Sequence, residues 1–376
     1  MRITFLLPVV GWSGGIRVAA IYARWLADRG HHVTLVSQAA KAPTWRQQLK
    51  NILKGKGWIK HQPVPTSYLD GLGLEHKVVP AGRIPGPADV PPGDVLISTW
   101  WETAEWAYHL PDDRGARAYF VQGHEVFDYL PRLRCEATYR LPFHKIVIAQ
   151  WLADVMANQY GDAGVDLVSN AVDHSLFHAA VRGKQRQPTV GFLYHEASFK
   201  GTDIALSVVR LLGVRYPELK VVVFGSKPPG GIHSLPDFAD FHMAPPQENL
   251  RQLYATCDVW LTTSRTEGFN LMAMEAMACR TPVVSTRTGW PIEGIEDGVN
   301  GYLVNIDDVD AAVEAVARVL NLDDQSWRFM SANAFATVAH STWEVSCQKF
   351  EKALYHACER SRKGEIQGKP SQAVVC

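Results

Sequence analysis

Residues 259–286 read VWLTTSRTEGFNLMAMEAMACRTPVVST, and the fold class follows from this stretch. Two short apolar runs, at 259–264 and 281–286, enclose a segment with helical spacing. An apolar run, a helix and a second apolar run are typical of two parallel strands joined by a crossover helix. The stretch therefore predicts a parallel α/β fold.

The same alternation continues on both sides of this stretch. A polar, turn-rich passage from about 173 to 188 interrupts it, and helical patterns lie between most of the apolar runs. The fold class is therefore α/β, with two Rossmann-like, doubly wound domains facing a central cleft beyond the carboxyl ends of their strands. We expect the further strands at 3–8, 33–37, 94–99, 116–122, 145–149, 165–170, 190–195, 220–225 and 301–304.

The domain boundaries follow from this rhythm, because 376 residues suffice for two domains of roughly 100–200 residues each. The apolar start, at 3–10, leads into a glycine turn without a small-residue cleavage site, so we expect a buried first strand rather than a signal peptide. The expected parts are an N-terminal Rossmann-like domain at 1–175, an interdomain linker at 176–187, a C-terminal Rossmann-like domain at 188–342, a C-terminal helix at 343–364 packing back across the domains, and a flexible tail at 365–376.

Composition and charge exclude several classes of protein. Hydrophobic residues make up 47% and charged residues 20%, which excludes a largely disordered chain. Lys plus Arg and Asp plus Glu balance at 38 each, so no overall charge attracts nucleic acid, and we expect no nucleic-acid partner. The six cysteines form no CxxC pair and are sparse for a disulfide framework, so we expect a reducing, cytoplasmic location. No apolar run approaches the roughly 18 residues of a membrane span.

A glycine-rich turn follows the first predicted strand. Gly14 and Gly15 let a ligand approach the backbone at the start of a helix, where free N–H groups favour an anion. The turn is not a G-x-G-x-x-G motif, and neither half of the chain has that motif with an acid about 20 residues later. An ordinary tight turn is therefore an equal alternative, and an NAD-dependent dehydrogenase is disfavoured.

Two acids in the opening stretch carry the strongest functional signal. Glu267 follows a predicted strand, and Glu275 lies about one turn inside the next helix. A carboxylate in such a loop can accept hydrogen bonds from sugar hydroxyls, and the free N–H groups of 268–271 can hold a phosphate. Considered alone, the two acids are better explained as residues of a helix N-terminus, because the helix dipole favours negative charge there.

The segment around the two acids resembles the E-x7-E signature of the retaining glycosyltransferases of family 4, which adopt the GT-B fold. Other stretches are similar to that family in the same order: the P-x5-GG opening followed by LADRGHHV (26–33), VSNAVDHSLF (168–177) with Ala171 in place of a glycine, FKGTDIAL (199–206), and TPVVSTRTGWPIEGIEDGVNGYLV (281–304). Together these stretches span most of residues 1–304.

The resemblance implies roles for individual residues. Glu275 would bind the nucleotide ribose, and the catalytic residues would be Glu267 at the donor sugar, His124 near that sugar and Lys200 at the diphosphate, whose charge grows as the sugar–phosphate bond breaks. A structural role is an equal alternative for His124. The donor-binding residues would be Gly14, Gly15, His195, Lys200, Arg265, Gly268, Phe269, Asn270, Leu271 and Glu275.

Two positions depart from the family pattern. His195 stands five residues before Lys200, where the family usually has an arginine, and a neutral imidazole donates one hydrogen bond without charge. Arg265 or His195 itself is the candidate to compensate. Asn270 replaces the second glycine of the common E-G-F-G-L pattern, and its amide is a candidate sugar contact.

A DxD pattern formed by Asp308 and Asp310 is a candidate metal site. Both acids lie at the start of a predicted helix, where capping and the helix dipole account for them. We therefore expect no metal site and no cofactor, and the resemblance also implies metal-independent catalysis.

The passage at 41–62 is basic and contains no acidic residue. Its apolar residues Trp45, Leu49, Ile52 and Leu53 share one helical face, beside Lys and Arg side chains. A helix of this kind suits contact with an anionic membrane surface through 44–60. The alternatives are a solvated flap over the acceptor cleft and a helix packed on its own domain.

The resemblance to family 4 implies a retaining, hexosyltransferase-type glycosyltransferase. The C-terminal domain would bind a nucleotide diphosphate sugar, and the N-terminal domain a glycan or lipid-linked acceptor. The expected role is polysaccharide or glycoconjugate synthesis for the cell surface, in the cytoplasm, with peripheral contact to the inner face of the membrane. The alternatives are a GT-B nucleotide-sugar epimerase, an inverting transferase and a noncatalytic sugar-nucleotide binding protein.

Overall fold

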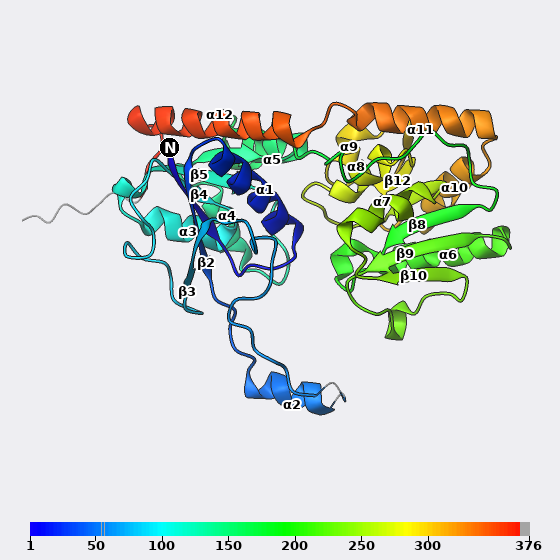
Figure 1. Ribbon diagram of the computed structural model, residues 1–376, viewed down its shortest axis with the longest axis horizontal. Coiled ribbons are helices and arrows are strands. Elements are labelled where there is room, and N and C mark those ends of the chain that lie inside the picture. Colours follow the sequence, from blue (N-terminus) through cyan, green and yellow to red (C-terminus); the bar gives the residue numbers. More distant parts are fainter. Residues whose placement is uncertain (54, 56, 369–376) are drawn as a thin grey trace, which may run out of the picture. The chain divides into compact units, whose positions relative to one another are not determined.

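The computed structural model describes residues 1–53, 55 and 57–368, which form two compact units (Figure 1). The first unit contains Met1–Ile148, Leu152–Val168 and the chain from Cys347 onward, and the second contains Ala149–Trp151 and Ser169–Ser346. The passage expected as a linker, 176–187, lies within the second unit. Most of the expected tail, from residue 369, lies outside the described residues.

The first unit is built on a seven-stranded parallel sheet in the order β3-β2-β1-β4-β5-β6-β7. The direction of winding reverses between β1 and β4, where Ile3 pairs with Val95 on one side and Val33 on the other. The strands are β1 Arg2–Leu7, β2 His32–Gln38, β3 Glu75–Val79, β4 Val95–Ser98, β5 Ala116–Val121, β6 His144–Val147 and β7 Asp166–Leu167. The helices up to β7 are α1 Gly14–Asp28, α2 Trp45–Leu53, α3 Trp101–His109, η1 Asp112–Arg114, α4 Arg132–Thr138 and α5 Gln150–Tyr160.

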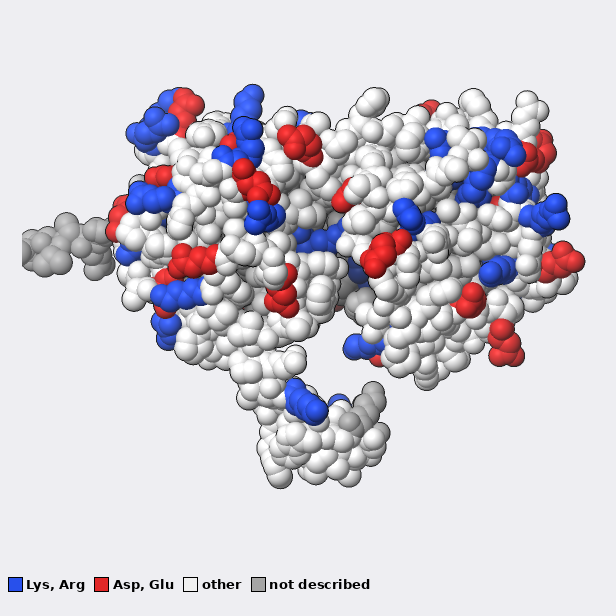
Figure 2. Space-filling view, viewed as in Figure 1, with Lys and Arg blue, Asp and Glu red and all other residues white. Residues whose placement is uncertain are grey.

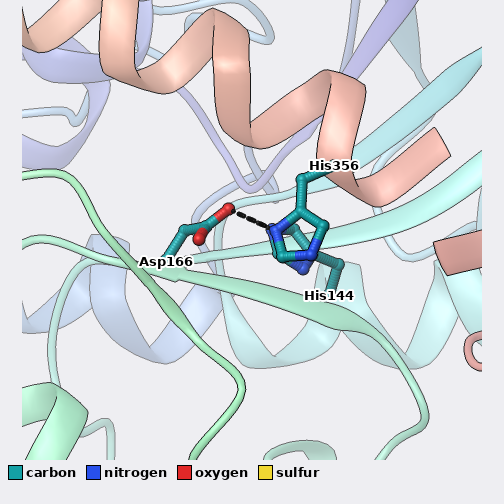
Figure 3. A group of neighbouring side chains, drawn as sticks. All are labelled: His144, Asp166 and His356. Carbon is teal, nitrogen blue, oxygen red and sulfur yellow. Dashed lines mark hydrogen bonds and ion pairs between the residues drawn. The ribbon is translucent and has the colours of Figure 1, made fainter. Parts of the chain in front are cut away.

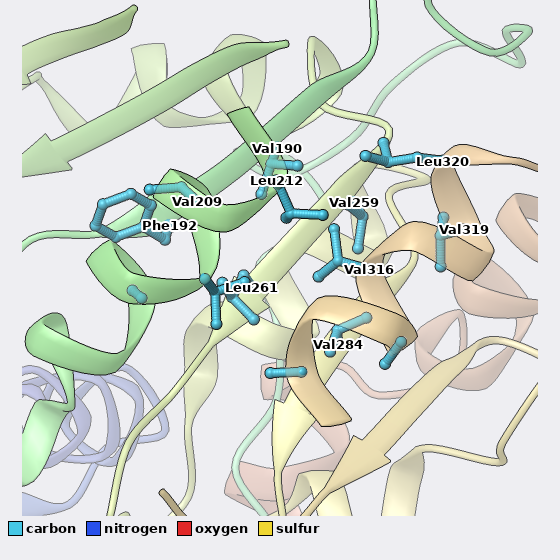
Figure 4. Close-up of a cluster of buried hydrophobic side chains, with 14 of the residues drawn as sticks. Val190, Phe192, Val209, Leu212, Val259, Leu261, Val284, Val316, Val319 and Leu320 are labelled. Carbon is cyan, nitrogen blue, oxygen red and sulfur yellow. The ribbon is translucent and has the colours of Figure 1, made fainter. Parts of the chain in front are cut away.

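The second unit has a six-stranded parallel sheet in the order β10-β9-β8-β11-β12-β13, and its winding reverses between β8 and β11. Aliphatic side chains of the strands pack against α6 and α10 in a continuous core (Figure 4). The strands are β8 Thr189–Leu193, β9 Lys220–Gly225, β10 Ala239–Met243, β11 Val259–Thr262, β12 Val283–Thr286 and β13 Gly301–Val304. The helices are η2 Ser198–Lys200, α6 Thr202–Arg215, η3 Gly231–His233, α7 Gln247–Ala255, α8 Leu271–Ala278, α9 Pro291–Gly294, α10 Val309–Leu320 and α11 Asp324–Val338.

The predicted α/β class is confirmed, and every predicted strand is present within a few residues. Two strands were missed, β3 and β10, and both lie at the edge of a sheet. Most of their residues are exposed or only partly buried, because these edge strands are not covered like the central ones. A central parallel strand is buried on both faces and shows a continuous apolar run, which is the signal that these two strands lack.

The last helix, α12 Trp343–Arg362, returns the chain to the first unit. Phe350 stacks on Tyr22 of α1 with ring centroids 4.2 Å apart, and Phe350 and Leu354 are fully buried. The next residue of α12, Glu351, has a carboxylate oxygen 2.7 Å from His31 Nε2. A helix far along the chain thus completes the core of the first unit.

A cluster of two histidines and an aspartate also attaches α12 to β6 and β7 (Figure 3). His144 Nε2 and His356 Nδ1 each lie 3.0 Å from Asp166 Oδ2, and an Arg360 guanidinium nitrogen lies 3.1 Å from His144 Nδ1. A guanidinium can only donate, so the proton of His144 lies on Nε2 and is donated to Asp166. This imidazole offers no lone pair to a metal, and we interpret the cluster as a hydrogen-bonded clasp.

The clasp predicts a loss of stability on acidification. Burial lowers the pKa of His144 in the folded protein. Below about pH 6.5 the unfolded chain therefore binds a proton more readily than the folded protein does, and acidification favours unfolding. The hydrogen bond from His144 lowers the pKa of Asp166 to about 2, so a second loss follows as the pH falls from about 4 toward that value. Thermal unfolding at pH 7.5, 6 and 5 should show a smaller drop in Tm for His144→Gln than for the wild type. The exposed His61→Gln should retain the wild-type slope, and equal slopes for all three proteins would contradict the expectation.

Candidate functional site

Two loops leave the carboxyl ends of β8 and β11, the neighbouring strands at which the second sheet reverses its winding. Thr263 Oγ1 donates a hydrogen bond of 2.7 Å to the Gly201 carbonyl, and the Arg265 N–H donates one of 2.7 Å to the Phe199 carbonyl. These bonds join the loop after β8 to the loop after β11. Open parallel sheets bind their ligands at such a reversal point.

Gly201 makes this close approach possible. Its backbone is left-handed, with φ of 65°, and a Cβ atom would overlap the carbonyl oxygen of Thr263. The preceding side chain, Lys200, places its Nζ 2.7 Å from Glu267 Oε1, and Ser264 Oγ donates to the same oxygen at 2.7 Å. The Lys200 side chain is 20% exposed and that of Glu267 is 9% exposed. The structure thus brings together Lys200 and Glu267, two of the three residues predicted to be catalytic.

His195 presents a single donor beside this pair. The Ala197 N–H donates to His195 Nδ1 at 3.0 Å, so in the neutral ring the proton lies on Nε2. Burial, followed by the charges of Lys200 and Lys227, lowers the pKa of His195. The ring is therefore neutral at pH 7 and carries one Nε2–H donor.

Arg265 is already engaged by two carboxylates. Its guanidinium donates to both oxygens of Asp203, at 3.0 and 2.7 Å, and to Asp307 at 2.7 Å. It also donates to the Ser198 carbonyl at 2.6 Å. The hydrogen bond with Asp203 raises the pKa of Arg265 and lowers that of Asp203. In this structure Arg265 fixes the loop after β11 to the first turn of α6.

The second acid of the motif, Glu275, lies inside α8 and is 3% exposed. Its Oε2 accepts a hydrogen bond of 3.0 Å from the Tyr254 hydroxyl. At the start of α8, Asn270 is left-handed with φ of 76°, and its side chain makes no capping bond. The Asn270 amide nitrogen instead donates to Thr262 Oγ1 at 3.1 Å. The helix therefore begins at Leu271 without a side-chain cap, while the Asn270 amide is turned toward β11.

The rest of the loop is supported by the segment after β12. Phe269 stacks on Trp290 with ring centroids 6.1 Å apart, and the Trp290 N–H donates to the Phe269 carbonyl at 2.7 Å. Gly289 is left-handed, and a Cβ there would lie 2.6 Å from the same carbonyl. The Gly268 carbonyl accepts a bond of 3.0 Å from the Trp151 indole. These contacts fix the path of the backbone from 268 to 270.

The predicted residues of the first unit gather around Gln122. Gln122 Nε2 donates to the Gly15 carbonyl at 3.2 Å, and a Cβ on Gly15 would lie 3.4 Å from that nitrogen. A Cβ on Gly14 would meet nothing within 4 Å, so the chain's own packing does not require that glycine. His124 is half-buried two residues after Gln122, and its Nε2 lies 2.7 Å from the Tyr160 hydroxyl oxygen. The glycine turn and His124 thus share the carboxyl edge of the first sheet.

Sequence reasoning missed Ser264 and Gln122. Each is a polar residue that follows a buried strand at its carboxyl end, which is a detectable signal. The capping prediction for the DxD pattern is confirmed, because Asp308 accepts a hydrogen bond of 2.9 Å from the Ala311 N–H at the start of α10.

The fold is that of solved glycosyltransferase structures of the GT-B class. Sucrose-phosphate synthase from Thermosynechococcus elongatus matches with a TM-score of 0.70 and 18% identity, over 96% of this chain and 100% of that one. HepE of Anabaena, in complex with UDP and glucose, matches with a TM-score of 0.69 and 17% identity, over 95% of this chain and 100% of that one.

Residues 187–322 match the family described as Glycosyl transferases group 1. D-inositol 3-phosphate glycosyltransferase of Corynebacterium jeikeium is 30% identical over 196 residues, which are 48% of this chain and 46% of the relative. GDP-mannose-dependent alpha-mannosyltransferase of Corynebacterium glutamicum is 31% identical over 190 residues, which are 48% of this chain and 44% of the relative. The matched part of the chain thus spans less than half the length of these curated relatives.

Because Gly201 lies so close to Thr263, we expect alanine substitution to reduce stability far more at Gly201 than at Gly14. Gly201→Ala must place a Cβ against a backbone carbonyl in a left-handed conformation, so we expect a loss of at least about 2 kcal/mol in the free energy of unfolding. Gly14→Ala places its Cβ in open space, and we expect a change below about 0.5 kcal/mol. Urea denaturation of the two variants measures both, and similar values would contradict the role given to Gly201.

Proposed function

We propose that this protein transfers a glycosyl group from a nucleoside diphosphate sugar to an acceptor hydroxyl, with retention of anomeric configuration. The observation that carries the proposal is the Lys200–Glu267 pair at the reversal point of the group 1 glycosyltransferase region. A diphosphate sugar presents an anion next to hydroxyl groups, and the pair offers a cation next to a hydrogen-bond acceptor.

In this proposal, Lys200 leaves Glu267 to neutralise the diphosphate, whose negative charge rises as the bond to the sugar breaks. The Nε2–H of His195 and the backbone N–H groups at the start of α8 donate to other phosphate oxygens. Glu267 keeps the hydrogen bond from Ser264 and accepts a second one from a sugar hydroxyl in place of the lysine. Glu275 accepts hydrogen bonds from the ribose, with the Tyr254 hydroxyl holding its carboxylate.

The bond changes need no protein nucleophile. The acceptor oxygen bonds to the anomeric carbon on the face from which the diphosphate oxygen departs. The acceptor's proton passes to that departing oxygen, so charge and atoms balance and the configuration is retained. The first unit would supply His124 near the donor sugar, and its glycine turn, predicted to bind the donor, would also face the acceptor.

The relatives support this donor class and a role in making polysaccharide or other glycoconjugates. One curated relative is a GDP-mannose-dependent alpha-mannosyltransferase, and HepE has been solved in complex with UDP-glucose. The described cysteines Cys135, Cys257, Cys279 and Cys358 carry free thiols, which suits the reducing cytoplasm that we propose as its location.

The donor site is tested by thermal shift with UDP, GDP, dTDP, ADP and NAD, followed by turnover of the matching sugar donors. We expect one nucleoside diphosphate to raise Tm. His195→Arg adds a cation and should strengthen its binding about three- to tenfold, while His195→Ala should weaken it about as much, the worth of one hydrogen bond. A shift with NAD alone would overturn the proposal.

Turnover distinguishes the alternatives. An epimerised sugar nucleotide formed without acceptor would indicate an epimerase, and an inverted product would indicate an inverting transferase. Binding without turnover for any sugar donor would indicate a sugar-nucleotide binding protein. Glu267→Gln keeps the size of the side chain and should lower the turnover of a transferase far more than it lowers diphosphate binding.

We further propose that the α2 segment of the first unit, residues 41–62, contacts an anionic lipid surface. Helix α2 stands away from the rest of its unit (Figure 1), and Figure 2 shows basic and uncharged but no acidic side chains on the visible face of this projection. Trp45 is 72% exposed, Leu53 78% and Trp58 59%, and Trp45 and Trp58 lie with ring centroids 5.9 Å apart. Gln48 holds the segment together by bonding both backbone groups of Ile59.

Exposed tryptophan and leucine beside lysine and arginine are typical of helices that lie in the surface of an anionic membrane. The described basic residues of this segment are Lys41, Arg46, Lys50 and Lys60, and the predicted Lys54 and Lys56 lie outside the described residues. Among the described residues, the helices are all too short or too polar to cross a bilayer.

Co-sedimentation with vesicles tests the membrane contact. We expect binding to phosphatidylglycerol-containing vesicles and little binding to pure phosphatidylcholine, because the basic side chains need anionic lipid. A double variant, Trp45→Ser with Leu53→Ser, should lose at least about thirtyfold in binding, since each exposed side chain contributes about 1–2 kcal/mol. The control Val214→Ser removes an equally exposed apolar side chain from α6 and should bind normally. Equal loss in both variants, or equal binding to both vesicles, would contradict the proposal.

A further inference from the structure

The loop that carries His124 is held from both sides by one tyrosine. The Tyr139 hydroxyl accepts a hydrogen bond of 2.8 Å from the Glu125 N–H and donates one of 3.1 Å to the Gly123 carbonyl. These two backbone groups flank His124 directly. The Glu125 side chain is fully buried and accepts a bond of 2.8 Å from the Trp101 N–H at the start of α3. The backbone of His124 is therefore fixed, and the orientation of its ring depends on what the ring contacts.

The ring of His124 has one hydrogen-bond partner among the described residues, the Tyr160 hydroxyl at 2.7 Å from Nε2. Tyr160 is the last residue of α5 and follows His124 by 36 positions in the sequence. Its ring packs against the rings of His124 and Tyr139. The Tyr139 ring centroid lies 5.4 Å from that of His124 and 5.0 Å from that of Tyr160. The Arg140 guanidinium lies 4.9 Å from the Tyr160 ring centroid. The phenol is thus packed in one orientation.

The direction of this hydrogen bond follows from the chemistry of the two groups. Burial raises the pKa of Tyr160 to about 12 and lowers that of His124, so the phenol is protonated and the imidazole is neutral near pH 7. A phenol O–H is a good donor and a neutral imidazole nitrogen is a good acceptor, while a phenol oxygen is a weak acceptor. Tyr160 therefore donates to Nε2, and the proton of His124 lies on Nδ1.

The geometry points to Tyr160 as a positioning residue for His124: its hydroxyl holds the ring in one orientation and in the Nδ1–H form, so that Nδ1–H is the donor presented to the ligand. This inference rests on the proposed function, in which His124 contacts the donor sugar. Nothing in the chain's own packing uses the Nδ1–H within the described residues, which leaves it for a sugar hydroxyl or a phosphate oxygen. The ligand group that it meets must then be a hydrogen-bond acceptor.

Tyr160→Phe isolates this effect, because it keeps the ring between Tyr139 and Arg140 and removes only the hydroxyl. Nitrogen-15 NMR of selectively labelled histidine reports the tautomer of each imidazole, and a His124→Gln spectrum assigns the His124 signals. We expect the wild-type His124 to show Nδ1 protonated and Nε2 unprotonated at pH 7.5. In Tyr160→Phe the signals should move toward the Nε2–H form. An Nε2–H form in the wild type, or an unchanged tautomer in Tyr160→Phe, overturns the inference.

Kinetics give the second readout. In Tyr160→Phe we expect kcat to fall about three- to tenfold, the worth of one neutral hydrogen bond, with KM for the donor within twofold and Tm unchanged. Tyr216→Phe removes a surface hydroxyl that bonds Asn321 and serves as the matched control, with wild-type kcat expected. An unchanged kcat in Tyr160→Phe overturns the positioning role. If the wild type transfers no sugar, the proposed function fails, and the NMR measurement still decides whether Tyr160 sets the tautomer.

Discussion

The contact between Gly201 and the backbone of Thr263 is the feature on which the geometry of the Lys200–Glu267 pair depends. Only a residue without a side chain can follow Lys200 in a left-handed conformation so close to the next strand's loop. This approach brings the loops after β8 and β11 together, so that Lys200 reaches Glu267 at 2.7 Å. A charge pair at this depth has a defined geometry because the backbone beneath it cannot move apart without losing the hydrogen bonds of Thr263 and Arg265.

The site is electrostatically satisfied without a ligand, and this shapes how a ligand would enter. Lys200 and Glu267 neutralise each other in a partly buried position, where an unpaired charge would be costly. An incoming group must therefore replace both halves of the pair at once. A diphosphate joined to a sugar does this, because its anion takes the lysine while a sugar hydroxyl donates to the carboxylate. A bare anion would draw Lys200 away and leave Glu267 with one donor among the described residues, the Ser264 hydroxyl.

Two histidines, one in each unit, take opposite tautomeric forms, and a neighbouring group sets each form. The Ala197 N–H occupies Nδ1 of His195 and leaves Nε2–H as its donor, whereas the Tyr160 hydroxyl occupies Nε2 of His124 and leaves Nδ1–H. Burial lowers the pKa of both rings, so neither is a cation near neutral pH. Each ring thus offers one directed, neutral donor rather than a positive charge. A neutral, directed donor of this kind discriminates between ligands by the position of their acceptor atom more than by their charge.

The amino-acid sequence was sufficient for the parallel α/β class, for the central strands and for the placement of Glu267 and Lys200 after two of them. Central strands are buried on both faces and are therefore recognised in the sequence as apolar runs. A residue that directly follows such a strand must lie at its carboxyl end, so locating the strand also locates that residue. The edge strands β3 and β10 were missed because half-covered strands carry no such run. Other contacts are seen only in the folded chain. They join Gln122 to Gly15, Tyr160 to His124, Arg265 to Asp203, and His356 to β6 and β7. Each of these contacts joins residues separated by 36 to 212 positions, and no local periodicity records a pairing that arises when distant elements pack together.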